Sequence, residues 1–251
     1  MLASCGSDDE QPQKENQPQN EREVLYFDGV ENGHTYVDLG LPSGLKWATM
    51  NVGAISPKGF GNYYAWGETV PQSNNRYSWD SYKWCNGSYN SMTKYCAPYD
   101  IVGNNTTLNL EDDAASVNWG GSWRMPTYIE QKELINNCYW VWTDRYNGTS
   151  MAGYIVYKVK LSSDKGQVVT FWNTPSNSYS LYDSHIFLPA AGFCFEGSSA
   201  YECSLGFYWS SSLSESQNCY AWILQFGSID RDDYYNYSRC RGYSVRAVCD
   251  K

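Results

Sequence analysis

Residues 126–137 read PTYIEQKELINN and carry the clearest local signal in the chain. Thr127 followed by Glu130 is a capping box, in which each of the two side chains bonds a backbone N–H at a helix start. Leu134 supplies an apolar residue two turns further on. We therefore expect a helix that begins after Thr127 and ends near Asn137.

Beyond this helix the chain changes to short runs of aromatic and β-branched residues separated by Gly, Asn and Ser, which is typical of strands and turns. Upstream, residues 34–50 read as two strands broken by residues 41–44, and residues 110–119 suit a short acidic-capped helix. The pattern predicts an α+β domain with two helices and a largely antiparallel multi-stranded sheet. The strands expected after the helix are residues 140–143, 154–161, 168–172, 186–191, 207–210, 220–226 and 243–248.

Composition allows a large core and argues against one class of partner. The 251 residues include 17% aromatic side chains and 11 Trp, so aromatic packing can fill the interior. The formal net charge is −9 and the sequence pI is about 4.7. Without a basic stripe, we expect no nucleic-acid partner.

The amino terminus resembles that of bacterial lipoproteins. Leu2-Ala-Ser-Cys5 matches the short box whose Cys becomes lipidated, and the acidic cluster within Gly6-Ser-Asp-Asp-Glu10 resembles the surface-export signal of Bacteroidetes lipoproteins. A signal peptide normally precedes such a box, so we expect a start further upstream or a trimmed segment. The alternative is a solvated acidic tail.

The resemblance implies lipidation at Cys5, outer-membrane anchoring and display at the cell surface. Residues 11–23 lack apolar side chains and cannot bury enough surface to fold. We therefore expect an anchor and disordered linker over residues 1–23 and a folded domain over residues 24–251.

The segment from Tyr201 to Tyr243 has the composition of a binding loop. Tyrosine offers large, stiff contact area, and Ser, Asn and Asp offer adaptable hydrogen bonds. The alternative is a Tyr-rich sheet surface with polar turns. The residues expected to contact a ligand are Tyr201, Ser214, Ser216, Asn218, Tyr220, Asp230, Asp232, Tyr234, Tyr235, Asn236, Tyr237, Ser238 and Tyr243.

An ordered set of motifs resembles a domain of Bacteroidetes surface lipoproteins that is related to the Fibrobacter major paralogous domain. The resemblance covers residues 33–248 and implies the C-type lectin fold, in the branch that includes formylglycine-generating enzymes and phage tropism proteins. The motifs are Tyr36-Val-Asp-Leu-Gly-Leu-Pro-Ser-Gly-Leu-Lys-Trp-Ala-Thr-Met-Asn51, Tyr64-Ala-Trp-Gly-Glu68, Trp119-Gly-Gly-Ser-Trp-Arg-Met-Pro-Thr127, Phe187-Leu-Pro-Ala-Ala-Gly192, Tyr208-Trp-Ser-Ser211 and Ser244-Val-Arg246.

The carboxyl-terminal stretch also resembles the variable proteins of diversity-generating retroelements, in which adenine-specific mutagenesis rewrites Asn-rich codons. This resemblance implies a variable region over residues 195–246, in which diversified positions alternate with a scaffold. The scaffold residues are Gly206, Trp209, Ser210, Trp222, Leu224, Phe226, Gly242, Ser244, Val245 and Arg246.

Eight of the nine cysteines remain once Cys5 is set aside. Cys85 and Cys96 flank a short polar loop that a disulfide can close, and Cys138 can join Cys249, although the sequence cannot establish either pairing. Cys203, Cys219 and Cys240 follow no regular spacing. Such positions fit random outcomes of codon mutagenesis better than a disulfide framework. No CxxC pair occurs, which argues against a structural zinc site.

Catalytic and metal-binding patterns are scarce. The two histidines, His34 and His185, stand at a turn and beside a strand, and we expect structural roles for both. Residues 230–233 cluster carboxylates without the Gly of a calcium loop, so we expect an exposed acidic loop, no metal and no cofactor. No nucleophile elbow or HExxH motif occurs, and we expect no enzymatic activity.

Three functional classes follow. The first is a surface-displayed receptor or adhesin that binds an unknown protein or glycan ligand. The second is a structural component of a fimbria or the envelope, whose Tyr/Ser surface packs against other subunits. An enzyme is the third, and it has the least support in the sequence.

Overall fold

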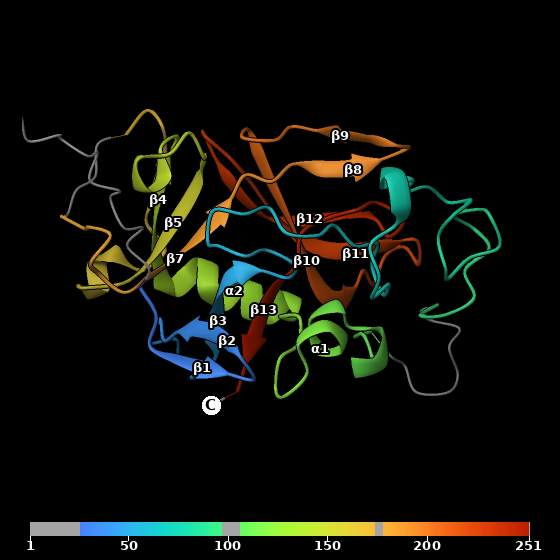
Figure 1. Ribbon diagram of the computed structural model, residues 1–251, viewed down its shortest axis with the longest axis horizontal. Helices are drawn as coiled ribbons and strands as arrows, with labels where there is room; N and C mark the ends of the chain where they lie inside the picture. The colour runs from blue at the N-terminus through green and yellow to red at the C-terminus, as the bar shows by residue number, and fades with distance from the viewer. Residues whose placement is uncertain (1–25, 97–105, 174–177, 251) are drawn as a thin grey trace, which may run out of the picture.

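The computed structural model describes residues 26–96, 106–173 and 178–250, with the backbone alone described at residues 232–234. The expected lipidation site Cys5 and the linker of residues 11–23 lie outside the described residues. Helix α2 spans Tyr128–Asn137 and crosses the middle of the molecule (Figure 1). Within the described ranges, no helix has the length and apolar character needed to cross a bilayer.

The start of α2 is fixed by the expected capping box. Thr127 Oγ1 accepts a hydrogen bond from the Glu130 N–H at 3.3 Å, and the Glu130 carboxylate accepts one from the Thr127 N–H at 2.7 Å. Arg124 holds the same carboxylate with a 2.6 Å contact. Further along, Gln131 Nε2 donates to the Tyr208 and Trp209 carbonyls at 3.2 Å each. These bonds confirm the predicted helix start and tie α2 to the strand behind it.

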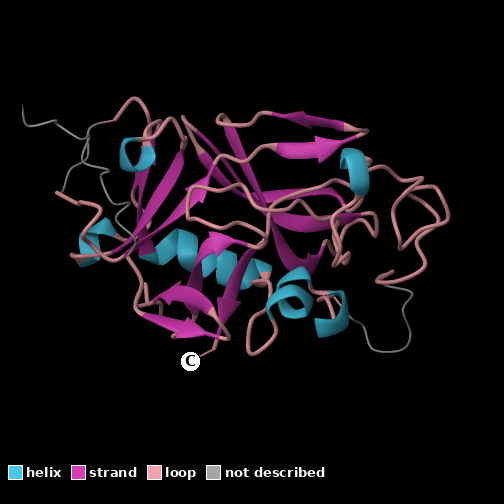
Figure 2. Cartoon of the chain, in the orientation of Figure 1, coloured by secondary structure: helices cyan, strands magenta, loops and turns pink. Residues whose placement is uncertain are grey.

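The strands form three larger sheets and one hairpin, shown with the helices in Figure 2. Among the described strands, only β6 runs parallel to its neighbour, β4. The first sheet has the order β1 (Gly29–Glu31), β2 (His34–Val37), β3 (Lys46–Asn51) and β13 (Arg246–Cys249). The second has the order β6 (Val168–Val169), β4 (Cys138–Thr143), β5 (Gly153–Lys158) and β7 (His185–Pro189). The third has the order β10 (Leu205–Leu213), β11 (Tyr220–Gly227) and β12 (Arg231–Ser238), and the hairpin pairs β8 (Phe193–Phe195) with β9 (Ser198–Ala200).

This arrangement confirms the α+β class with two α-helices and mostly antiparallel strands in the described part of the chain. Short 3-10 helices interrupt the connections. They are η1 (Ser73–Asn75), η2 (Leu110–Asp112), η3 (Tyr146–Gly148) and η4 (Ser162–Asp164).

Two sequence expectations need correction. The helix expected over residues 110–119 is divided into η2 and α1 (Ala114–Trp119), because Asp113 leaves helical geometry and caps α1 through its side chain. The acidic loop expected at residues 230–233 is wrong as well. Only Asp230 stands in the turn, and Arg231 begins the strand β12. Pairing with β11 imposes the extended conformation on a segment whose composition favours turns.

The third sheet lies between two buried clusters, because alternate side chains of its strands point to opposite faces. Side chains on successive strand residues point to opposite faces. On β11, Leu224 and Phe226 therefore join the cluster around α2 and β4, whereas Ala221 and Ile223 join the cluster around α1. Opposite Phe226, a β-carbon on Gly206 would come within 2.2 Å of the phenyl ring. Glycine is needed at that position of β10 because the ring occupies the space.

A fully buried arginine joins the first and last parts of the chain. Arg246 on β13 donates to Asn51 Oδ1 at 3.0 Å and to the carbonyl oxygens of Ala48 and Phe187 at 2.9 and 2.7 Å. Burial lowers the pKa of its guanidinium to about 10, so the group stays cationic at neutral pH. Three oriented dipoles replace water around the charge. The contact accounts for the Arg in the Ser244-Val-Arg246 motif.

The eight cysteines in the described residues form no disulfide bond with one another. The Cys85 thiol instead donates to the Trp79 carbonyl at 3.1 Å. Cys138 belongs to the cluster around α2, and Cys249 belongs to the cluster around α1. Neither disulfide considered from the sequence is therefore present.

Candidate functional site

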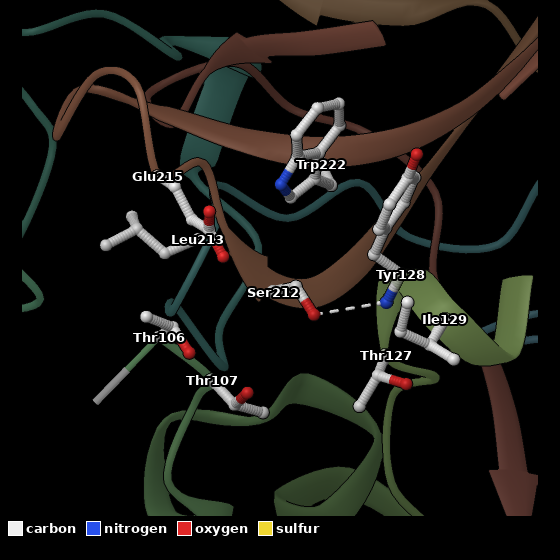
Figure 3. Close-up of a pocket in the computed structure, with 9 residues that line it drawn as sticks. All are labelled: Thr106, Thr107, Thr127, Tyr128, Ile129, Ser212, Leu213, Glu215 and Trp222. Carbon is white, nitrogen blue, oxygen red and sulfur yellow. Dashed lines mark hydrogen bonds between the residues drawn. The ribbon is translucent and has the colours of Figure 1, made fainter. Parts of the chain in front are cut away.

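A pocket of about 410 Å³ lies where the amino-terminal end of α2 meets the third sheet (Figure 3). The register of β10 shifts between Trp209 and Leu213, and this irregular stretch bonds two other segments. The Ser211 N–H donates to the Pro126 carbonyl at 2.8 Å, while the Leu213 N–H donates to the Thr106 carbonyl at 2.7 Å. A bulge of this kind re-aims side chains and frequently adjoins a functional site. The lining residues are Thr106, Thr107, Thr127, Tyr128, Ile129, Ser212, Leu213, Glu215 and Trp222.

One side of the pocket is aromatic. Tyr128 and Trp222 stack with ring centroids 4.5 Å apart and planes 20° apart. The Tyr128 N–H also donates to Ser212 Oγ at 3.1 Å, the dashed bond in Figure 3. Both rings are half-buried, so part of each remains accessible. The backbone bond holds the first residue of α2 in place and thereby fixes the position of the stack.

The rest of the lining is polar and carries one charge. Glu215 is exposed in the turn between β10 and β11, and in Figure 3 it lies across the pocket from Tyr128. In Figure 3 Ser212 lies between these two sides, and Thr106 and Thr107 lie below Glu215; all three carry hydroxyl groups. An apolar wall with a few convergent polar groups is the usual character of a ligand pocket.

None of the residues expected to bind ligand lines this pocket, but several adjoin it. Ser214 and Ser216 flank Glu215, and their hydroxyls are 3.0 Å apart. Asn236 pairs with Trp222 across the strands and donates from Nδ2 to Ser214 Oγ at 3.0 Å. Ser214 is itself buried, so its predicted role in ligand contact is replaced by support of the turn.

Three other predicted residues lie near the same end of the sheet. Tyr220 pairs with Ser238, and both are partly exposed on the same face as Trp222. Asn218 is partly exposed, and its carbonyl accepts a 2.9 Å bond from the buried Arg239 guanidinium. This surface beside the pocket therefore combines a tyrosine ring with polar side chains.

The remaining predicted residues are dispersed. Tyr235 and Tyr237 pair with Ile223 and Ala221, which places them on the opposite face of the third sheet. Tyr201 and Asp230 are exposed near the far end of that sheet, where β10 begins and β11 ends. The side chains of Asp232 and Tyr234 lie outside the described part of the structure.

Tyr243 was expected at the binding surface, and the structure corrects this. Its exposed fraction is 0%, because Trp209, Phe207 and Phe193 surround the ring. Burial raises the pKa of its phenol strongly. Tyr243 is a core residue and cannot contact a ligand in this conformation.

The residues that line the pocket are not among those predicted from the sequence. Trp222 was assigned to the scaffold, although its alternation with Ala221 and Ile223 indicates that it faces away from the core cluster they join. Glu215 lies inside the segment from Tyr201 to Tyr243 that the composition predicts to bind ligand. It is not among the predicted contact residues, because that prediction relies on the tyrosines and the neighbouring Ser, Asn and Asp residues. Tyr128 comes from a different region, and no sequence signal connects it to Trp222.

Both histidines make packing or hydrogen-bond contacts. His34 stacks on Trp119 with centroids 3.9 Å apart. His185 is buried, and its Nδ1 donates to the Asp183 carbonyl at 2.8 Å while Nε2 faces the Tyr146 hydroxyl at 3.2 Å. Over residues 26–96, 106–173 and 178–250, no group of three or more His, Cys, Asp or Glu side chains is placed to hold a metal ion. No protein-family model, curated protein or solved structure matches the chain.

Proposed function

We propose that this protein is a ligand-binding protein of the receptor or adhesin type, displayed on the cell surface through a lipidated Cys5. Its binding site is the pocket between Tyr128 and Trp222, extended by the polar surface beside it. The observation that carries the proposal is the accessible aromatic stack opposite Glu215. Two of these three residues belong to the tail segment whose composition suits recognition. The function is binding without a catalytic step.

The scaffold we propose is the C-type lectin fold, with a tail diversified by a retroelement. Support comes from the ordered motifs of the sequence and from the α+β architecture with mostly antiparallel strands. The exposure of side chains within residues 195–246 limits which positions can vary. Ser216, Asn218 and Tyr220 are at least partly accessible, so we expect exchange there to leave the core intact, whereas Tyr243 and Arg246 are buried in the core.

Deep sequencing of codons 195–251 in a population of source cells tests the diversification. We expect substitutions at adenine positions of a nearby template repeat, in the codons of Ser216, Asn218 and Tyr220. The Tyr243 codon should stay constant, because the core does not accept the products. A uniform sequence with no repeat would refute diversification and leave an adhesin of fixed specificity.

The proposed anchoring has its own test. Cells supplied with labelled palmitate should incorporate the label into the wild-type protein and not into the Cys5→Ala variant. Protease added to intact cells should remove the wild-type domain if it is displayed outside the outer membrane. Label in the Cys5→Ala variant would contradict lipidation at this cysteine.

A second function is favoured by a separate observation. Phe171 and Trp172 project from the turn after β6, and the Phe171 N–H bonds the Ser228 carbonyl at 2.8 Å, beside exposed Ile229. Trp172 is 76% exposed. Large exposed apolar patches mark interaction sites, as a structural envelope component would need. Sedimentation equilibrium of residues 24–251 tests this: assembly that Trp172→Ser abolishes would favour the structural function.

A further inference from the structure

The lining of the pocket suits one kind of chemical group. Glu215 is the single charged residue in the lining, and the side opposite it presents the rings of Tyr128 and Trp222. A carboxylate facing an aromatic ring attracts a cation from both sides, since the ring face carries the negative end of its quadrupole. Hydroxyls of Thr106, Thr107 and Ser212 supply acceptors for N–H donors.

The structure already places a cation against this aromatic stack. Lys132, one turn along α2, holds its ammonium 5.4 Å from the centroid of the Tyr128 ring. Lys132 is not among the residues that line the pocket. Tyr128 thus stacks on Trp222 and already accepts one cation, so we expect an incoming cation to meet chiefly the Trp222 ring.

The volume of the pocket and the net charge of the protein also favour a cationic side chain as the bound group. A pocket of about 410 Å³ can hold a long side chain together with part of its backbone. The net charge of −9 raises the local concentration of basic partners and speeds their encounter. A planar guanidinium stacks on an aromatic face and bonds a carboxylate with two parallel N–H groups, which an ammonium cannot do.

From these observations we infer that the pocket binds an arginine side chain presented by a basic protein partner. The guanidinium lies between the Glu215 carboxylate and the Tyr128–Trp222 stack, and the hydroxyl groups accept its remaining N–H bonds. This inference rests on the proposed function because it uses the same pocket. If position 215 differs between diversified copies of the protein, the inference concerns only the copy with Glu215.

The test titrates two peptides of equal shape and different charge. Acetyl-Gly-Arg-Gly-amide and its citrulline counterpart are added to the nitrogen-15-labelled protein. The indole N–H resonance of Trp222, assigned with the Trp222→Phe variant, reports occupancy. We expect saturable binding of the arginine peptide and binding about tenfold weaker for the citrulline peptide, as loss of a cation–π contact and an ion pair implies.

Matched variants locate the charge effect. Glu215→Gln removes the charge at an exposed position with little change of shape and should weaken the arginine peptide by about tenfold. Glu202→Gln makes the same chemical change at an exposed position outside the pocket and should have no effect. Equal binding after Glu215→Gln would overturn the inference.

The outcomes separate this inference from the proposed function. If the two peptides bind equally well and both shift the Trp222 resonance, the pocket binds ligands without reading charge. The inference then fails and the proposed function stands. If neither peptide binds, the inference also fails. The proposed function is then decided by whether Trp222→Ala alters capture of ligands by cells that display the protein.

Discussion

Tyr128 and Trp222 stack at 4.5 Å between ring centroids, and this contact joins the first residue of α2 to the central strand of the third sheet. The two residues come from distant parts of the chain, and each also lines the pocket. One pair therefore contributes to tertiary packing and to the candidate binding surface. Stability and binding can be separated by how each responds to substitution.

A double-mutant cycle measures the stack. Tyr128→Ala, Trp222→Ala and the combined variant are compared by urea denaturation. We expect a coupling free energy of about 1 kcal/mol, the usual contribution of a stacked aromatic pair beyond its buried area. Strictly additive free energies of unfolding would show that the rings only lie side by side without stabilising each other.

Tyr243 and Tyr235 should respond differently to alanine. Tyr243 lies in the aromatic core, so Tyr243→Ala should lower the free energy of unfolding by about 3–5 kcal/mol through loss of packing and the cavity left behind. Tyr235 is 42% exposed, and Tyr235→Ala should cost about 1 kcal/mol or less. Thermal or urea unfolding measures the loss of stability in each of the two variants. A large loss at Tyr235 would place that residue in the core.

Acid should destabilise the fold partly through His185. Burial lowers the pKa of its imidazole below the ordinary 6.5, so the unfolded state binds a proton at a higher pH than the folded state. The stability contributed by neutral His185 is present above pH 6.5 and is lost as the pH falls below that value. His185→Gln should be less stable at neutral pH but should lose less stability on acidification.

The control for this effect is His34→Gln. The pKa of His34 is also lowered by burial, but this imidazole is only partly covered. The free energy of unfolding is measured across the acidic range for both variants and the wild type. An unchanged pH dependence in His185→Gln would exclude His185 as the group responsible.

Replacing Arg246 by lysine should be costly although the charge is kept. The guanidinium reaches three acceptors on β3 and β7, and a lysine ammonium on a single stem cannot reproduce that geometry. We expect Arg246→Lys to lower the free energy of unfolding by about 3 kcal/mol, as for other broken buried charge networks. Lys46→Arg, a change at a partly exposed ion pair, is the matched control. Equal stability of both variants with the wild type would contradict the assignment.

Much of the fold follows from local signals in the sequence. The Thr127 and Glu130 capping box predicts where α2 starts because its bonds form within one helical turn. The alternation along β11 predicts a strand with two different faces. By contrast, β12 reads as a polar loop, and it becomes a strand through pairing with β11. Local composition does not encode that partner.

The site is less predictable than the fold for the same reason. The composition of the tail singled out the segment that contains Glu215 and Trp222. It did not indicate which tyrosines would be buried, because Tyr243 and Tyr235 are chemically identical and differ only in their neighbours. Nor did it supply Tyr128, whose position depends on how α2 packs against β10.

Because β13 pairs with β3, we expect a chain that lacks β13 to fold poorly. A stop codon or frameshift upstream of Arg246 removes the strand that completes the first sheet, together with the guanidinium that three segments share. Such a product leaves an open strand edge and an incomplete core during synthesis, and cellular proteases and chaperones act on species of this kind. If the tail is diversified as proposed, chains that lose Arg246 or β13 would fail to fold, and folding would then select among the rewritten copies.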